Sequence, residues 1–132
     1  MSTVSGHCLC GEVTFSTEAE HLWCAHCHCT MCQLAHGAAF VTWAGYPDNA
    51  VTLKDSKLVW YQSSKKAERG FCSQCGSTLF FRSTKWPGEL HIATGLIQGN
   101  ANPQPTGHAH YDTHFSWVTE LNDLPVGKQN SP

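Results

Sequence analysis

The sequence predicts a single all-β domain built from short antiparallel strands with little helix. Its 132 residues correspond to one domain. Short runs of alternating apolar and polar residues are separated by turn residues, which is typical of all-β structure. No linker divides the chain, and no internal repeat is visible. Eight cysteines, most of them in tight spacings, mark the chemistry that this domain carries.

The first half of the chain predicts strands at 12–17, 22–27 and 38–43, a helical turn at 30–36 and a tight turn at 45–50. In the first strand, Val13 and Phe15 alternate with polar residues and so share one face. Gly37 is placed to close the helical turn in a left-handed conformation. Pro47 followed by Asp48 and Asn49 occupies favourable turn positions.

The second half predicts a hairpin of 51–54 with 58–62, a charged loop at 63–70, a strand pair of 77–81 with 90–94 around a turn at 84–88, an irregular loop at 98–107 and a last strand at 114–119. The loop at 63–70 is predicted from its charges, and the one at 98–107 from its Pro, Gly and Asn residues. We expect a frayed C-terminal tail.

Charge argues against partners with large anionic surfaces. The net charge is −2, so we expect no nucleic acid and no membrane surface as partner. Residues 54–85 contain seven of the eight Lys and Arg residues against two acids, and this local excess suits a small anion. Residues 21–47 lack charged residues, but four His and four Cys in this segment exclude a membrane span.

The N-terminal residues have neither a basic region nor an apolar run, so we expect no secretory signal and a cytoplasmic location. In that compartment thiols stay reduced, and clustered cysteines bind metal or act in catalysis. The oligomeric state does not follow from the sequence.

Two cysteine pairs predict a structural zinc site. Cys8 and Cys10 form one pair, Cys72 and Cys75 form the other, and each pair is followed directly by glycine. Such short turns supply two thiolates each to a tetrahedral ion while their backbone amides donate to the sulfurs. The glycine permits the positive φ that the turn requires. Four buried thiols without metal are the alternative.

The run CAHCHCTMC predicts a second, more open site. In an extended strand, Cys27 and Cys29 point to one face and Cys24 to the other, and Cys32 returns from the helical turn. Three thiolates with an open fourth position are typical of catalytic zinc. A bend at Ala25 would instead bring Cys24 in as a fourth ligand and close the site.

The segments SGHCLCGEVTF, HCHCTMCQLAHGAAF and GFCSQCGSTLFFRS, in this order and spacing, resemble the glutathione-dependent formaldehyde-activating enzyme family, which also includes centromere protein V. The resemblance covers a core of about residues 6–125 and leaves 126–132 as a flexible tail. It implies a β-tent fold with two zinc ions, with Trp117 and Leu121–Pro125 resembling the C-terminal strand. It also implies that Cys8, Cys10, Cys72 and Cys75 hold a structural zinc. Cys27, Cys29 and Cys32 match the catalytic zinc site, and Cys24 is not a ligand in the family.

This resemblance implies a carbon–sulfur lyase that forms or cleaves a thiol adduct such as S-hydroxymethylglutathione, with glutathione or a related thiol as partner. A zinc ion with an exchangeable position would hold a substrate thiol deprotonated. Two other functions stay open. One is a non-catalytic carrier of glutathione or its adducts, and the other is a structural zinc module for association with other molecules.

Lyase chemistry also needs an acid, a partner for substrate carboxylates and pocket walls. The candidate acids are the histidines near the cysteines and those farther along the chain: His26, His28, His36, His91, His108, His110 and His114. The candidate carboxylate partners are Lys65, Lys66, Arg69, Arg82 and Lys85. Any of Trp23, Trp43, Trp60, Trp86 and Trp117 could line the pocket.

Overall fold

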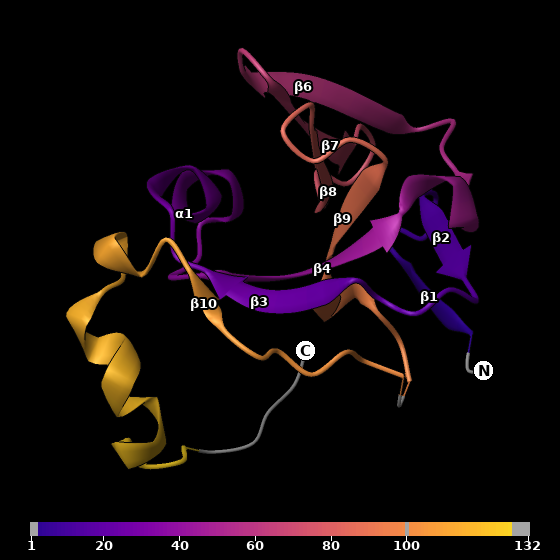
Figure 1. Ribbon diagram of the computed structural model, residues 1–132. Helices are drawn as coiled ribbons and strands as arrows, with labels where there is room; N and C mark the ends of the chain where they lie inside the picture. The colour runs from indigo at the N-terminus through magenta and orange to yellow at the C-terminus, as the bar shows by residue number, and fades with distance from the viewer. Residues whose placement is uncertain (1–2, 100, 128–132) are drawn as a thin grey trace.

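The protein is described by a computed structural model covering residues 3–99 and 101–127. Within these described residues, ten strands and one α-helix form the fold (Figure 1). The strands are β1 (Val4–His7), β2 (Thr14–Thr17), β3 (Trp23–Cys27), β4 (Val41–Pro47), β5 (Val51–Lys54), β6 (Leu58–Ser64), β7 (Ala67–Cys72), β8 (Thr78–Ser83), β9 (Glu89–Ala93) and β10 (His108–Ala109). The helix is α1 (Thr30–His36). Short 3₁₀ segments occupy 48–50, 94–96, 111–113 and 116–123.

The strands form two sheets. The small sheet has the order β1-β2-β5, and the large one has the order β10-β3-β4-β9-β8-β7-β6. All pairings are antiparallel except the short pair of β10 with β3. The predicted all-β class with little helix is therefore confirmed. In Figure 1, β3 and β4 run beneath α1, while β6, β7 and β8 rise beside it.

The main core lies where the two sheets face each other. Phe15 of β2 and Phe80 of β8 meet edge to face, with ring centroids 5.7 Å apart. Tyr46, Leu79 and Ile92 are fully buried around them. A second, smaller cluster contains Cys32, Val41, Trp43 and Ala93 and lies beneath the helix. This second cluster fixes one wall of the site described below.

Several predicted elements are confirmed. Helix α1 covers the predicted range, and Gly37 ends it in the left-handed conformation with φ 59°. The pair of 77–81 with 90–94 is present as β8 with β9. Residues 101–107 are irregular, as expected for the loop at 98–107. The tail expected at 126–132 lies mostly outside the described residues.

The predicted hairpin of 51–54 with 58–62 is wrong. β5 pairs with β2 in the small sheet, and β6 pairs with β7 in the large one. The charged loop predicted at 63–70 is also wrong. Residues 63–64 end β6, residues 65–66 form a turn, and residues 67–70 belong to β7, which pairs with β6. The strand at 38–43 begins later, at Val41, and continues through part of the predicted turn to Pro47.

The last predicted strand, at 114–119, is also wrong, because residues 116–123 form a 3₁₀ helix. This segment includes part of Leu121–Pro125, so the C-terminal strand implied by the family resemblance is absent there. None of its residues is buried, and neither sheet of the described residues includes this segment. The structure adds β1, which the sequence did not predict.

Candidate metal centres and the pocket beside them

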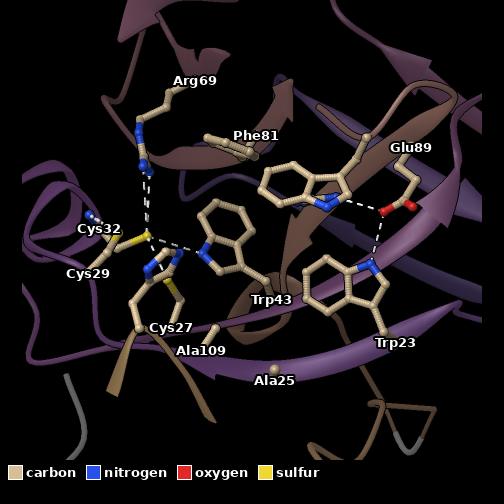
Figure 2. Close-up of a pocket in the computed structure, with 13 residues that line it drawn as sticks. Trp23, Ala25, Cys27, Cys29, Cys32, Trp43, Arg69, Phe81, Glu89 and Ala109 are labelled. Atoms are coloured by element: carbon tan, nitrogen blue, oxygen red, sulfur yellow. Dashed lines mark hydrogen bonds and ion pairs between the residues drawn. The ribbon is translucent and has the colours of Figure 1, made fainter. Parts of the chain in front are cut away.

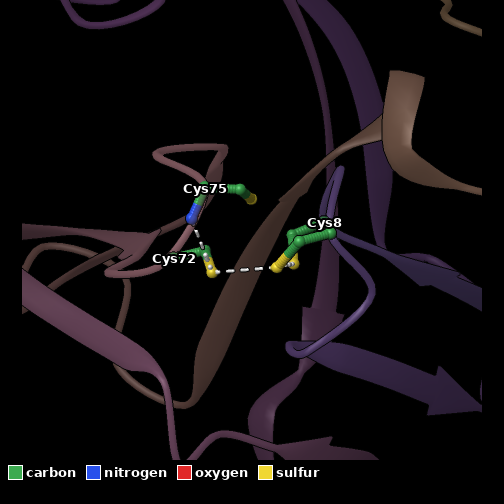
Figure 3. Close-up of side chains that lie close together, drawn as sticks. Cys8, Cys72 and Cys75 are labelled. Carbon is green, nitrogen blue, oxygen red and sulfur yellow. Dashed lines mark hydrogen bonds between the residues drawn. The ribbon is translucent and has the colours of Figure 1, made fainter.

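Four cysteines from two distant segments meet at the join between the sheets (Figure 3). Cys8 and Cys10 follow β1, and Cys72 ends β7 with Cys75 in the turn after it. All four Sγ atoms lie within 4.8 Å of one another. The Sγ atoms of Cys10 and Cys72, 62 residues apart in the chain, are separated by 3.7 Å. Four sulfurs at this spacing fit one tetrahedral ion.

Backbone amides donate to the sulfurs, as predicted for the two short cysteine turns. The amide of Val13 donates to Cys8 Sγ at 3.3 Å. The amides of Gln74 and Cys75 donate to Cys72 Sγ at 3.4 and 3.5 Å. The glycine after each pair, Gly11 and Gly76, has φ of 84° and 81°. Hydrogen bonding to Ser77 is the largest cause of a lowered pKa at Cys75, about 5.

Three further cysteines meet where β3 runs into α1. The Sγ atoms of Cys27, Cys29 and Cys32 lie within 4.8 Å of one another. Cys29 caps the helix, and its sulfur accepts the backbone amide of Cys32 at 3.3 Å. Both cysteine clusters are able to hold a metal ion.

Cys24 lies on the opposite face of β3, as strand alternation predicts. It is 2 % exposed, packs in the main core and donates from Sγ to the carbonyl of Pro103 at 3.8 Å. No bend at Ala25 brings it to the other cysteines, since β3 pairs with β4 without interruption. Burial raises the pKa of the Cys24 thiol.

Cys32 is surrounded by donors (Figure 2). The indole N–H of Trp43 donates to its Sγ at 3.4 Å, and both terminal nitrogens of Arg69 donate at 3.8 and 3.7 Å. Its hydrogen bond with Cys27, whose sulfur is 3.6 Å away, is the largest cause of a pKa lowered to about 4. Trp43 and Arg69 lower that pKa further, and burial opposes them.

Arg69 itself is 6 % exposed and reaches Cys32 from β7. Its guanidinium lies over the ring of Phe81, 5.1 Å from the centroid. No carboxylate pairs with it in the described parts of the chain. A buried cation needs a counter-charge, so this environment favours the thiolate form of Cys32.

A pocket of about 360 Å³ opens beside the three cysteines. Its lining is mostly aromatic and apolar, with Arg69, Glu89, His91 and His110 as the charged or titratable residues besides the cysteines. In Figure 2 the cysteines lie at one end, Trp43 in the middle, and Trp23 with Glu89 at the other end. The remaining lining residues are Ala25, Phe81, Trp86 and Ala109.

The end of the pocket far from the cysteines has its own hydrogen-bond network. Glu89 Oε1 accepts from Trp23 Nε1 and from His91 Nε2, both at 2.9 Å. His91 is 5 % exposed, and burial lowers its pKa although Glu89 acts in the opposite direction. Gly45, opposite Trp23 in the strand register, leaves room for the indole.

Most of the candidate histidines lie outside this pocket. His26, His28 and His108 gather on the reverse face of β3, where His28 and His108 hydrogen bond at 2.8 Å. His114 stacks on Tyr111 beside them, with ring centroids 3.7 Å apart. His36 packs against Trp43. Only His91 and His110 line the pocket, and His110 has a left-handed φ of 52°.

Of the five candidate carboxylate partners, only Arg69 lines the pocket. Lys66 and Arg82 line a neighbouring depression, in which Arg82 pairs with Glu68. Of the five tryptophans, Trp23, Trp43 and Trp86 line the pocket. Sequence reasoning missed Glu89 entirely, and only the i, i+2 spacing of Glu89 and His91 on one strand could have pointed to it.

Fold and site together define a small β protein with two cysteine clusters able to bind metal ions and a pocket beside one of them. The family model described as glutathione-dependent formaldehyde-activating enzyme matches residues 3–113. The chain therefore belongs to this family.

Two curated relatives agree with this assignment. One is an uncharacterized lyase of Schizosaccharomyces pombe, 29% identical over 102 residues, which cover 77% of this chain and 74% of the relative. The other, from Halomonas elongata, is named "Putative glutathione-dependent formaldehyde-activating enzyme" and is 27% identical over 115 residues, which cover 81% of this chain and 73% of that protein.

Among solved structures, a crystal structure of a Rhodobacter sphaeroides protein matches with a TM-score of 0.63 and 23% identity. The match covers 80% of this chain and 99% of that one, and it supports the fold. No helix in the described residues is long and apolar enough to cross a membrane.

Proposed function

We propose that the protein is a zinc-dependent carbon–sulfur lyase that forms or cleaves a thiol adduct such as S-hydroxymethylglutathione. In this proposal Cys27, Cys29 and Cys32 hold the catalytic zinc and leave one position for a substrate thiol. The observation that carries it is the cluster of three cysteine sulfurs at one end of the pocket. The family and the names of its relatives support the reaction class.

The donor sets fit zinc. Cysteine thiolates are ligands that Zn²⁺ prefers, and in this chain they are hydrogen bonded by backbone amides, an indole and a guanidinium. We assign the four-sulfur cluster of Cys8, Cys10, Cys72 and Cys75 as the structural zinc site, because its four ligands leave no open position. Bound at the three-cysteine site, zinc would supply an exchangeable position and lower the pKa of a substrate thiol.

The chain's own residues supply the rest of the chemistry. In the forward direction the substrate thiol gives up its proton to water, its sulfur attacks the carbon of formaldehyde, the carbonyl π bond breaks, and the oxyanion that forms takes a proton back from water. Arg69 is the cation beside this end of the pocket, and we assign its N–H groups to stabilise negative charge on that oxygen. Trp43 and Phe81 form aromatic walls of the pocket beside this end.

Two variants test the proposal. Cys29→Ala should lose one zinc per chain and lose the acceleration of adduct exchange, which exchange NMR of glutathione with formaldehyde measures. Cys24→Ala is the matched control, because Cys24 lies on the other face of β3. This control should keep both zinc ions and the exchange rate.

Loss of one zinc in Cys24→Ala would mean that the site is closed by four thiolates. Glutathione binding without any acceleration of exchange by the wild-type protein would favour a carrier. Either result would overturn the lyase proposal.

A further inference from the structure

Glu89 is a partly buried carboxylate in the pocket, and it also borders the neighbouring depression that Lys66 and Arg82 line. Its side chain is 22% exposed. Among the described residues, its hydrogen-bond donors are the neutral indole of Trp23 and the ring of His91, and both bind the same oxygen, Oε1. No Lys or Arg of the described chain forms an ion pair with it. Oε2 therefore keeps its acceptor capacity for a ligand.

His91 does not supply the missing charge at neutral pH. It is 5 % exposed, and burial lowers its pKa below the ordinary value of 6.5. The hydrogen bond from its Nε2 to Glu89 then comes from a neutral ring. This end of the pocket carries the negative charge of Glu89 alone.

Aromatic rings lie around His91, the histidine that hydrogen bonds to Glu89. The ring of His91 has Trp23, Phe81 and Trp86 around it, with centroids 4.6, 5.4 and 5.6 Å away. Trp23, Phe81 and Trp86 also line the pocket. A carboxylate among aromatic side chains favours a cation, because the carboxylate supplies charge and the ring faces attract positive groups.

The cysteine end of the pocket has the opposite arrangement. Arg69 is the cation of this pocket, and its terminal nitrogens are bound to Cys32 Sγ. A substrate carboxylate at the far end would meet Glu89 and no cation. The two ends thus differ in the charge that they accept.

We propose that the Glu89 end of the pocket binds an ammonium group of the thiol substrate whose sulfur occupies the cysteine end. This inference rests on the proposed function, because it takes the substrate to be a thiol. It deepens that function by naming the substrate class as amine-terminated thiols. In the γ-glutamyl group of glutathione, the ammonium and a carboxylate are attached to the same carbon. Because this carboxylate would lie near Glu89, glutathione fits the Glu89 end less well than an amine-terminated thiol does.

Three thiols of matched length test the inference on the zinc-loaded protein: aminohexanethiol, mercaptohexanol and mercaptohexanoate. Quenching of tryptophan fluorescence measures their binding, since three tryptophans line the pocket. The amine should bind about tenfold more tightly than the alcohol, as expected for a charge-assisted hydrogen bond, and the carboxylate should bind most weakly.

Glu89→Gln should abolish the preference for the amine and leave the affinity for the alcohol unchanged. The variant keeps an oxygen that can accept from Trp23 and His91. Glu68→Gln is the matched control, because Glu68 pairs with Arg82 in the neighbouring depression, which Glu89 also borders, and does not line this pocket. It should keep the preference.

Equal affinity for the three thiols, tighter binding of the carboxylate, or the same loss in Glu68→Gln would overturn the inference and leave the lyase proposal standing. If neither these three thiols nor glutathione binds, the lyase proposal fails, and hexylammonium against hexanol then decides the ammonium site by itself. Equal binding of these two compounds overturns it. If Glu89→Gln fails to fold, the ranking of the ligands on the wild-type protein is decisive.

Discussion

At the scale of single residues, the position of Arg69 explains the electrostatics of the three-cysteine site. Glu68 points outward to Arg82, and Arg69, next in the strand, points inward to Cys32. Because the guanidinium is buried and has no carboxylate partner in the described chain, its charge is compensated by the Cys32 sulfur. Metal affinity at this site should therefore depend on Arg69.

Arg69→Met should weaken zinc binding at the three-cysteine site by about tenfold to hundredfold, because it removes two donors and a positive charge from Cys32. Competition with a chromophoric chelator measures this affinity. Arg82→Met is the control, since Arg82 is exposed, pairs with Glu68, lies over the ring of Trp60 and does not line the pocket. An unchanged affinity in Arg69→Met would show that the guanidinium does not support the thiolate.

His91 gives a second test at this scale. Burial lowers the pKa of His91, so its NMR titration midpoint should lie below 6.5, and Glu89→Gln should lower it further because the raising effect of Glu89 is lost. The folded state then binds this proton less readily than the unfolded state. His91 therefore reduces stability as the pH falls from about 6.5 toward its folded pKa. A midpoint above 6.5 would mean that Glu89 has a charged partner.

The two cysteine clusters could be predicted from the sequence in part, because some of their geometry is local. Strand alternation separates Cys24 from Cys27, and a short turn brings Cys72 to Cys75. Arg69, Trp43 and Glu89 reach the pocket only through the pairing of distant strands. The spacing of residues along the sequence does not show which distant strands pair and so which side chains share the pocket.

At the scale of elements, the β6–β7 hairpin shows where sequence patterns fail. The segment Ser63–Gly70 contains four charged residues and two serines among its eight residues, which is typical of a loop. In the structure the charges are divided between a short turn and the two faces of β7. A buried Arg that binds a cysteine sulfur breaks the alternation of apolar and polar residues on which strand prediction depends.

The contact of β3 with β4 gives a test at this scale. Trp23 and Gly45 are register partners, and a Cβ atom at Gly45 would lie 2.3 Å from Trp23 Nε1. Gly45→Ala should displace the indole from Glu89 and lower the free energy of unfolding by about 1–3 kcal/mol, as overpacking does. Urea denaturation measures this change.

Gly95→Ala is the control for Gly45→Ala. No atom lies within 4 Å of the Cβ position at Gly95, so the variant should have nearly wild-type stability. Equal stability of the two alanine variants would show that Trp23 moves aside without cost.

At the scale of the whole molecule, the four-cysteine cluster joins the two sheets. One pair of its sulfurs follows the small sheet at β1, and the other pair follows the large sheet at β7. The loop between Cys10 and Cys72 spans 62 residues and contains β2 to β7. The three-cysteine cluster, in contrast, joins only neighbouring segments, β3 and α1. The two proposed zinc ions should therefore differ in what their removal does to the fold.

Chelation should remove zinc in two phases. The ion at Cys27, Cys29 and Cys32 has one protein ligand fewer and should leave first, with the far-UV circular dichroism unchanged. The second ion should leave only as the domain unfolds, because the free energy of a structural zinc site, about 10–16 kcal/mol in small peptides, is folding free energy. Metal analysis and circular dichroism, followed on the same samples, separate the two phases.

Cys72→Ser makes the same distinction without a chelator. It should lower the melting temperature strongly or prevent folding, because it removes one ligand of the zinc site that joins the two sheets. Cys29→Ala, in contrast, should lose one zinc and keep its fold. A soluble Cys72→Ser protein with the melting temperature of the wild type would contradict a structural role for this cluster. If the protein unfolds when the first zinc is lost, the three-cysteine site also stabilises the fold. In that case the small buried cluster of Cys32, Val41 and Trp43 beneath α1 requires metal to stay packed.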